Sequence, residues 1–127
     1  MGRTFLVVSV LLLVVACSNV GVYNARDVGF ITSSGASPQL ADIRRAIVVA
    51  ATSKNWSVKD IDDTHIEVTL RPRKHMARAT IEYSTSAFSI TYNDSTNMRF
   101  DGDTIHPNYN RWIRNLEVLI KTQISKL

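Results

Sequence analysis

A single cysteine, Cys17, most constrains how this chain can fold. It follows an apolar run from Phe5 to Ala16, which one basic residue, Arg3, precedes. A short basic region, an apolar core and small residues before a cleavage point are typical of a secretory signal peptide. Small exported domains often depend on paired cysteines, but a lone cysteine cannot form a disulfide within its own chain. We therefore expect the domain to be held together by its hydrophobic core alone.

The end of the apolar run, Val14-Val15-Ala16-Cys17, resembles the lipobox of bacterial lipoproteins. This resemblance implies that residues 1–16 are a signal peptide and that Cys17 becomes the lipidated first residue of the mature chain. Palmitate and an acylated amine would then hold the chain to a membrane. Ser18 is not the aspartate associated with inner-membrane retention, so the resemblance favours an outer-membrane lipoprotein that faces the periplasm.

The apolar run has other interpretations. About a dozen residues fall short of the roughly 20 that a membrane-spanning helix needs. Met1-Gly2 could begin a myristoylation motif, but that motif needs Ser or Thr where Leu6 stands. Cleavage by an ordinary signal peptidase, which would leave Cys17 as a free thiol or remove it, stays open as the alternative.

The expected mature chain is one small domain on a tether. Residues 18–36 are rich in Ser, Asn and Gly, which is typical of coil. We therefore assign residues 17–36 to a lipidated cysteine and a flexible tether that spans on the order of 25 Å. A short stretch around Gly29 to Thr32 could dock on the domain, which is expected to comprise residues 37–127.

The charge balance favours some partners over others. The chain has 15 basic and 11 acidic side chains, and it keeps a small basic excess when Arg3 is removed with the signal peptide. A basic excess often indicates nucleic acid as the partner. In an exported chain, however, anionic lipid headgroups, cell-wall polymers and envelope proteins are more accessible, so we expect no nucleic-acid partner.

Two segments have helical periodicity. Ser37 can cap the first and Pro38 suits its first position, and apolar residues then recur from Leu40 to Ala50. The second helix is expected to begin near Pro107 or Asn108. Its broad apolar stripe comprises Tyr109, Trp112, Ile113, Leu116, Leu119, Ile120 and Ile124.

Between the helices, apolar and polar residues alternate with the period of a half-buried strand. The clearest segments are 66–70, 77–83 and 88–92, with a shorter extended candidate over 56–59. The pattern predicts an α+β domain: a helix, a three- or four-stranded antiparallel meander and a second helix. Packing both helices on the apolar sheet face gives a two-layer sandwich. The other face would carry Glu67, Thr69, Arg71, Arg78, Thr80, Glu82 and Thr91.

Several short segments resemble a family of small uncharacterised lipoproteins of Gram-negative bacteria. They are Asn55-Trp56, Ile81-Glu82-Tyr83, Tyr92-Asn93-Asp94-Ser95, Asn97-Met98 and, most distinctively, Ile105-His106-Pro107-Asn108-Tyr109-Asn110-Arg111-Trp112. The resemblance covers the signal peptide and most of residues 38–127. It supports the lipoprotein assignment and implies no activity.

A polar and aromatic cluster near the second helix is the first candidate for a binding site. Aromatic faces suit sugar rings and peptide stems, while Asn and His side chains form hydrogen bonds. The candidate ligand-binding residues are Tyr92, Ser95, Asn97, His106, Tyr109, Asn110 and Trp112. Structural roles are the alternative: core packing for Tyr109 and Trp112, and capping of the helix by Asn108 or Asn110.

A basic cluster around Pro72 is the second candidate. Its members are Arg71, Arg73, Lys74 and Arg78, which could meet phosphate-bearing lipid, lipopolysaccharide or a polymer carboxylate. The alternative is a solvated hairpin end that keeps the sheet edge from pairing with other chains.

Catalytic and metal chemistry are poorly supported by the sequence. His65, His75 and His106 show no close ligand-pair spacing, and the Asp60–Asp63 and Asp101–Asp103 segments do not match a calcium loop. No G-x-S-x-G motif occurs. We therefore expect no cofactor and a non-catalytic binding or envelope-assembly role. A binder of a small ligand or cell-wall fragment is the alternative, and a hydrolase is favoured least.

Overall fold

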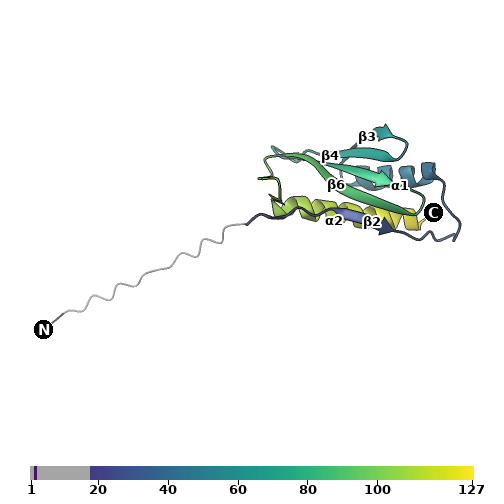
Figure 1. Ribbon diagram of the computed structural model, residues 1–127, viewed down its shortest axis with the longest axis horizontal. Helices are drawn as coiled ribbons and strands as arrows, with labels where there is room; N and C mark the ends of the chain where they lie inside the picture. The colour runs from purple at the N-terminus through teal and green to yellow at the C-terminus, as the bar shows by residue number, and fades with distance from the viewer. Residues whose placement is uncertain (1, 3–17) are drawn as a thin grey trace.

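The computed structural model describes Gly2 and residues 18–127, so the predicted signal peptide (apart from Gly2) and Cys17 lie outside the described residues. The described part is an α+β structure with a five-stranded antiparallel sheet and two helices (Figure 1). The elements in chain order are β1 (Val20–Gly21), β2 (Ala25–Gly29), α1 (Leu40–Ser53), β3 (Ser57–Asp62), β4 (His65–Leu70), β5 (Met76–Tyr83), β6 (Ala87–Thr96), β7 (Thr104–Ile105) and α2 (Pro107–Ser125).

The sheet order is β2-β6-β5-β4-β3, and each neighbouring pair is antiparallel. Strands β3 to β6 form the meander that the alternating pattern predicts. The α+β class is therefore confirmed, whereas the predicted number of strands is wrong, because β2 adds a fifth strand beside β6. A separate two-stranded sheet joins β1 to β7.

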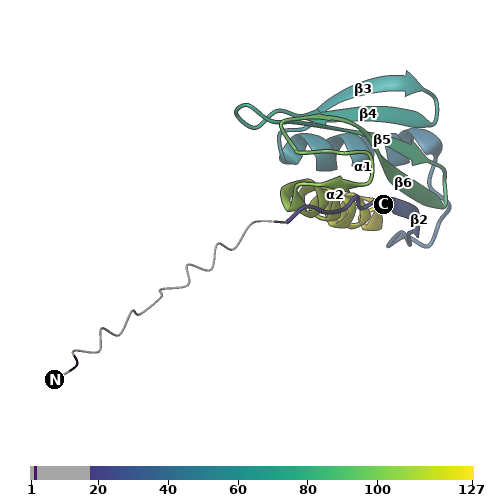
Figure 2. The ribbon, with the colours of Figure 1, turned by 60° about the vertical axis from the view of Figure 1, so that its left-hand side comes forward.

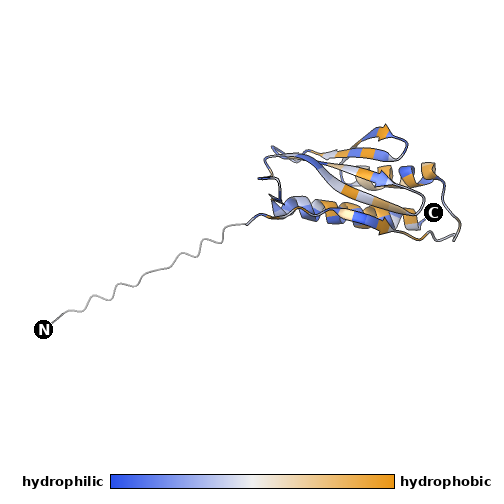
Figure 3. Cartoon of the chain, in the orientation of Figure 1, coloured by the Kyte–Doolittle hydropathy of each residue, from blue (hydrophilic) through white to orange (hydrophobic). Residues whose placement is uncertain are grey.

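The two faces of the sheet differ sharply in polarity. One face carries fully buried aliphatic side chains, such as Ile66, Ile81 and Ile90, which lie opposite one another on β4, β5 and β6. Hydrophobic and hydrophilic residues alternate along the strands (Figure 3). Helices α1 and α2 pack against each other, and Figure 2 shows them side by side beneath the sheet. The arrangement is compatible with a sandwich of one sheet and one helical layer.

Helix α1 begins later than its sequence suggests and ends in a defined cap. The N-cap is Gln39, whose carbonyl accepts hydrogen bonds from the backbone of Asp42 and Ile43. The predicted cap at Ser37 and first position at Pro38 are therefore wrong by two residues, a common error at helix ends. At the other end Asn55 adopts a φ of 66°, and Trp56 N–H bonds to Ala51 C=O. This is a Schellman cap, and it buries Trp56 in the core.

Helix α2 begins at Pro107, as the sequence predicts, and presents the expected apolar stripe to the core. Its buried residues are Tyr109, Ile113, Leu116, Ile120 and Ile124. Among the described residues, no helix is both long enough and apolar enough to cross a membrane.

The segment that the sequence assigns to a flexible tether is largely part of the domain. Ala25 pairs with Ile90 and is only 2% exposed, and Val20 pairs with Ile105. The prediction of coil is therefore wrong for Val20–Gly21 and Ala25–Gly29. The physical reason is that these strands are short and are stabilised by partners 58 to 85 residues later in the chain, which no local pattern reports.

Candidate functional site

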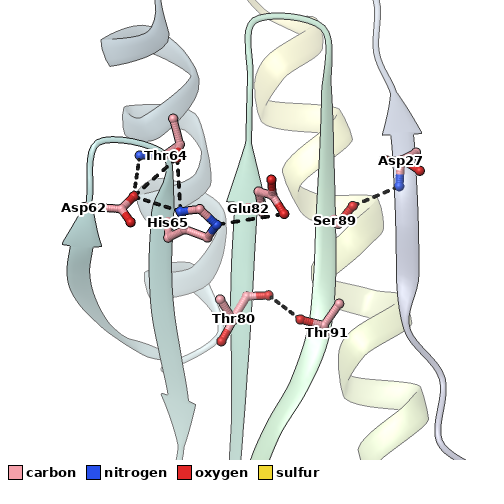
Figure 4. Close-up of polar contacts among 8 residues, drawn as sticks. All are labelled: Asp27, Asp62, Thr64, His65, Thr80, Glu82, Ser89 and Thr91. Carbon is pink, nitrogen blue, oxygen red and sulfur yellow. Dashed lines mark hydrogen bonds and ion pairs between the residues drawn. The ribbon is translucent and has the colours of Figure 1, made fainter.

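The sheet face opposite the helices forms a continuous polar surface, which we call the open sheet face. Residues opposite one another on neighbouring strands form rows across it. One row is Lys59, Glu67, Thr80 and Thr91; a second is Ser57, Thr69, Arg78 and Asp94; a third is Asp62, His65, Glu82 and Ser89. Figure 4 looks onto this face and shows both helices behind the sheet. The strand period places every second side chain here, away from the core.

Arg78 lies at the centre of the hydrogen bonds and ion pairs on this face. Its Nε donates to Thr69 Oγ1 at 3.2 Å and lies 3.5 Å from Glu67 Oε1. Its Nη1 lies 3.9 Å from Asp94 Oδ2. These contacts hold Arg78 flat across three strands and leave its side chain only 27% exposed. The sheet therefore presents a fixed pattern of charges.

His65 organises a second group of contacts at the start of β4 (Figure 4). Its Nδ1 lies 2.8 Å from Asp62 Oδ1, and its Nε2 lies 3.9 Å from Glu82 Oε2. Asp62 also accepts a hydrogen bond from the backbone N–H of Thr64 at 2.9 Å. The bond from Thr64, followed by that from His65, lowers the pKa of the Asp62 carboxyl below its usual value. Asp62 therefore stays ionised well into the acid range.

The charge on the open sheet face is opposite to that of the whole chain. Asp62, Glu67, Glu82 and Asp94 outnumber the basic side chains, Lys59 and Arg78. Threonine and serine hydroxyls lie between these charges, and Asn93 donates to Thr80 Oγ1 at 3.1 Å. Such a surface is complementary to a polar partner that presents basic groups.

The predicted basic cluster is split by the structure. Arg78 belongs to the open sheet face, where acidic groups surround it. Arg71, Arg73 and Lys74 lie in the exposed loop between β4 and β5. The four residues therefore do not share one environment, and their role as a patch for an anionic partner stays a prediction. Arg71 is also misplaced on the sheet face, because β4 ends at Leu70.

Two of the predicted ligand-binding residues organise the start of α2. His106 is the N-cap, and its Nδ1 accepts a hydrogen bond from Asn108 N–H at 3.0 Å. Burial lowers the pKa of His106, and the electrostatic effect of Arg99, His75 and Arg111 lowers it further. Both effects favour the neutral ring, which the cap requires. Asn110 accepts from Tyr23 N–H at 2.9 Å and donates to Gly21 C=O at 2.8 Å, so it binds the N-terminal segment as a neighbouring strand would.

Four other predicted residues also have structural partners. The rings of Tyr92 and Tyr109 meet edge to face at 5.5 Å, and Tyr92 Oη lies 2.8 Å from Ser95 Oγ. Tyr109 is fully buried, which raises its pKa. Asn97 Nδ2 donates to Lys74 C=O at 2.7 Å. These contacts occupy the Ser95 hydroxyl and the Asn97 amide nitrogen without a ligand.

Trp112 lies in a different environment from the other six. It lines a surface hollow of about 200 Å³ with Trp56, Leu70, Lys54, Asn115 and Leu116, between the end of α1, the end of β4 and α2. The structure thus brings Tyr92, Ser95 and Tyr109 together, but it places Trp112 with another set of residues. A ligand site that combines all seven has no geometric support here.

The contacts that secure the N-terminal segment were missed by sequence reasoning. Asn24 Oδ1 accepts from Tyr92 N–H at 2.8 Å, and Tyr23 Oη donates to Glu117 at 2.7 Å. The Arg114 guanidinium lies 3.8 Å from the centre of the Tyr23 ring. The available signal was composition: Val20, Val22, Tyr23 and Val28 are more apolar than a spacer needs.

Among residues 18–127, no group of three or more His, Cys, Asp or Glu side chains is arranged to hold a metal ion. Comparisons with protein-family models, curated proteins and solved structures found no match. Membership of the lipoprotein family therefore stays a prediction from the sequence.

Proposed function

We propose that this protein is a membrane-anchored lipoprotein that binds another envelope protein through the open sheet face and performs no catalysis. The anchor is Cys17, in the outer membrane, with the domain in the periplasm. The observation that carries the binding role is the open sheet face itself. Its acidic and hydroxyl groups are ordered by cross-strand contacts, and both helices lie on the other side of the sheet.

Several features support this function over the alternatives. A two-layer sandwich buries its apolar sheet face under the helices and leaves one rigid polar face for a partner. Two of the side chains proposed for a small ligand, His106 and Asn110, are used instead to cap α2 and to hold Gly21 and Tyr23. The acidic character of the face indicates a partner with basic groups.

The binding role can be tested by photo-crosslinking in cells. A photoreactive residue at Thr91, midway along β6 on the open sheet face, should give a discrete adduct with one envelope protein. The same residue at Val118, which is 62% exposed on α2, is the matched control and should give none. The double variant Lys59→Glu with Glu82→Lys keeps the net charge and should abolish the Thr91 adduct. Equal adducts at both positions, or an adduct that survives the charge swap, would contradict the proposal.

A further inference from the structure

The N-terminal segment determines which end of the domain faces the membrane, if Cys17 is the anchor as proposed above. Asn19 Nδ2 donates to Arg99 C=O at 2.8 Å, and Val20 pairs with Ile105 immediately afterwards. Only Ser18 stands between Cys17 and Asn19. Two residues span at most about 7 Å, compared with the 25 Å expected of a flexible tether. The domain therefore has almost no freedom to move away from its anchor.

A chain of contacts joins the anchored end to the basic loop between β4 and β5. His75 Nδ1 lies 2.8 Å from Asn97 C=O, and Asn97 Nδ2 donates to the Lys74 carbonyl. One residue further on, Met98 C=O accepts from His106 N–H at 2.8 Å. Figure 1 shows the purple start of the described chain at the same end as the beginning of α2. The loop of residues 71–75 and Asn19 thus belong to one end of the molecule.

This end combines positive charge with apolar side chains. Arg71, Arg73 and Lys74 are exposed in the loop, and Val20 and Phe100 keep 38% and 39% exposure. Near this end of β6, Asp94 pairs with Arg78. The other acidic residues at this end lie in the loop between β6 and β7. There the Asp101 carboxylate accepts hydrogen bonds from the backbone N–H groups of Asp103 and Thr104, which hold it against its own loop. Exposed basic and apolar groups together are typical of surfaces at a membrane interface.

We propose that this end is a membrane-facing surface that binds the phosphates of anionic lipid headgroups through Arg71, Arg73 and Lys74. Docking fixes the orientation of the domain relative to the bilayer. The five strands run from this end to the opposite one, so in the docked domain they point away from the bilayer. The open sheet face is then not covered by the membrane and stays accessible to a partner.

The orientation can be measured with two labels at opposite ends of one strand. Thr96 ends β6 near the basic loop, and Thr85 lies in the turn before β6 begins. Both are exposed, and the ten residues of β6 span about 33 Å. The full chain, as Thr96→Cys or Thr85→Cys, is purified from membranes, spin-labelled and placed in vesicles with or without phosphatidylglycerol. Intact mass reports the acyl anchor separately.

We expect the Thr96→Cys label to lie at headgroup depth in vesicles with phosphatidylglycerol, and the Thr85→Cys label to stay in water. Neutralising the loop with Arg71→Gln, Arg73→Asn and Lys74→Gln should lower the ratio of docked to undocked protein roughly 100-fold. Asn is chosen at position 73 because Arg73 has a φ of 57°, which Asn tolerates. The matched control, Arg45→Gln with Lys121→Gln and Lys126→Gln, should leave the ratio unchanged.

The possible failures are distinguishable. Acyl mass with both labels in water would overturn the orientation and leave the anchor in place. If the Thr96→Cys label lies at the same depth in neutral and anionic vesicles, the recognition of anionic headgroups is overturned. The same holds if the control variant lowers the docking ratio as much as the loop variant does. A purified chain without acyl mass would overturn the anchor, and the membrane-facing orientation with it.

Discussion

The two faces of the sheet are built by the same strands, yet they have opposite roles. Ile66, Ile81 and Ile90 form a row that is fully buried under the helices. The adjoining row, Glu67, Thr80 and Thr91, points the other way and stays partly exposed. A shift of one residue along a strand exchanges these environments. The comparison teaches that the covered face determines stability, whereas the open sheet face is available for binding.

The two faces should differ most in how much stability is lost when a side chain is truncated to alanine. Ile81→Ala should lower the free energy of unfolding by about 2–5 kcal/mol, because it leaves a cavity in a closely packed core. Its neighbour Thr80→Ala removes one exposed hydrogen bond, from Asn93, and should cost less than about 1 kcal/mol. Chemical denaturation measures both. Equal costs would contradict the division between the two faces.

The N-terminal segment should behave as part of the covered structure. Asn110→Ala removes two hydrogen bonds to Gly21 and Tyr23, and we expect it to cost about 1–3 kcal/mol. Hydrogen exchange at Tyr23 N–H should accelerate in the variant. Asn115→Ala, on an exposed part of the same helix, is the control and should change neither quantity. An Asn110→Ala variant of unchanged stability would show that this segment is a tether after all.

The cap of α2 should give the protein a modest pH dependence. Burial lowers the pKa of His106 below its ordinary value of 6.5, so the unfolded chain binds more protons there as the pH falls. The free energy of unfolding should therefore decrease as the pH drops through about 6.5 toward the folded pKa. His106→Asn retains a good N-cap and should remove this part of the decrease between about pH 7.5 and pH 5. Parallel pH curves for the two proteins would contradict this role of His106.

The smallest expected effect on stability belongs to the open sheet face. Lys59→Glu with Glu82→Lys changes exposed side chains and should alter the free energy of unfolding by no more than about 0.5 kcal/mol. The same double variant should lose the crosslink from Thr91. If thermal melting shows instead that the variant is strongly destabilised, the open sheet face also determines stability. That result would contradict the division of roles between the two faces.

Elements with strong local patterns were predictable from the sequence. Alternation identified β4, β5 and β6, and the apolar stripe identified α2 with its start at Pro107. The same alternation predicted six residues of the open sheet face: Glu67, Thr69, Arg78, Thr80, Glu82 and Thr91. It wrongly added Arg71 and did not include Lys59, Asp62 or Asp94. These predictions succeeded because burial of one face imposes a period that the sequence records.

The remaining features depend on contacts between distant residues. Strand β2 contains a bulge, with Asp27 at a φ of 48°, so it shows no clean alternation. Arg78 follows the basic loop closely in sequence, but its side chain turns to Glu67 and Asp94 on neighbouring strands. His106 and Asn110 have the chemistry of ligand-binding residues, and only the structure shows that backbone groups occupy them.

The most direct test of the central claim compares the natural chain with Cys17→Ala by membrane fractionation and intact mass. We predict that the natural protein begins at Cys17, carries the mass of acyl chains and sediments with the outer membrane. The variant should keep residues 1–16 or be released as a soluble protein. A natural protein that is soluble and unmodified would contradict the anchor and the membrane-facing orientation that depends on it.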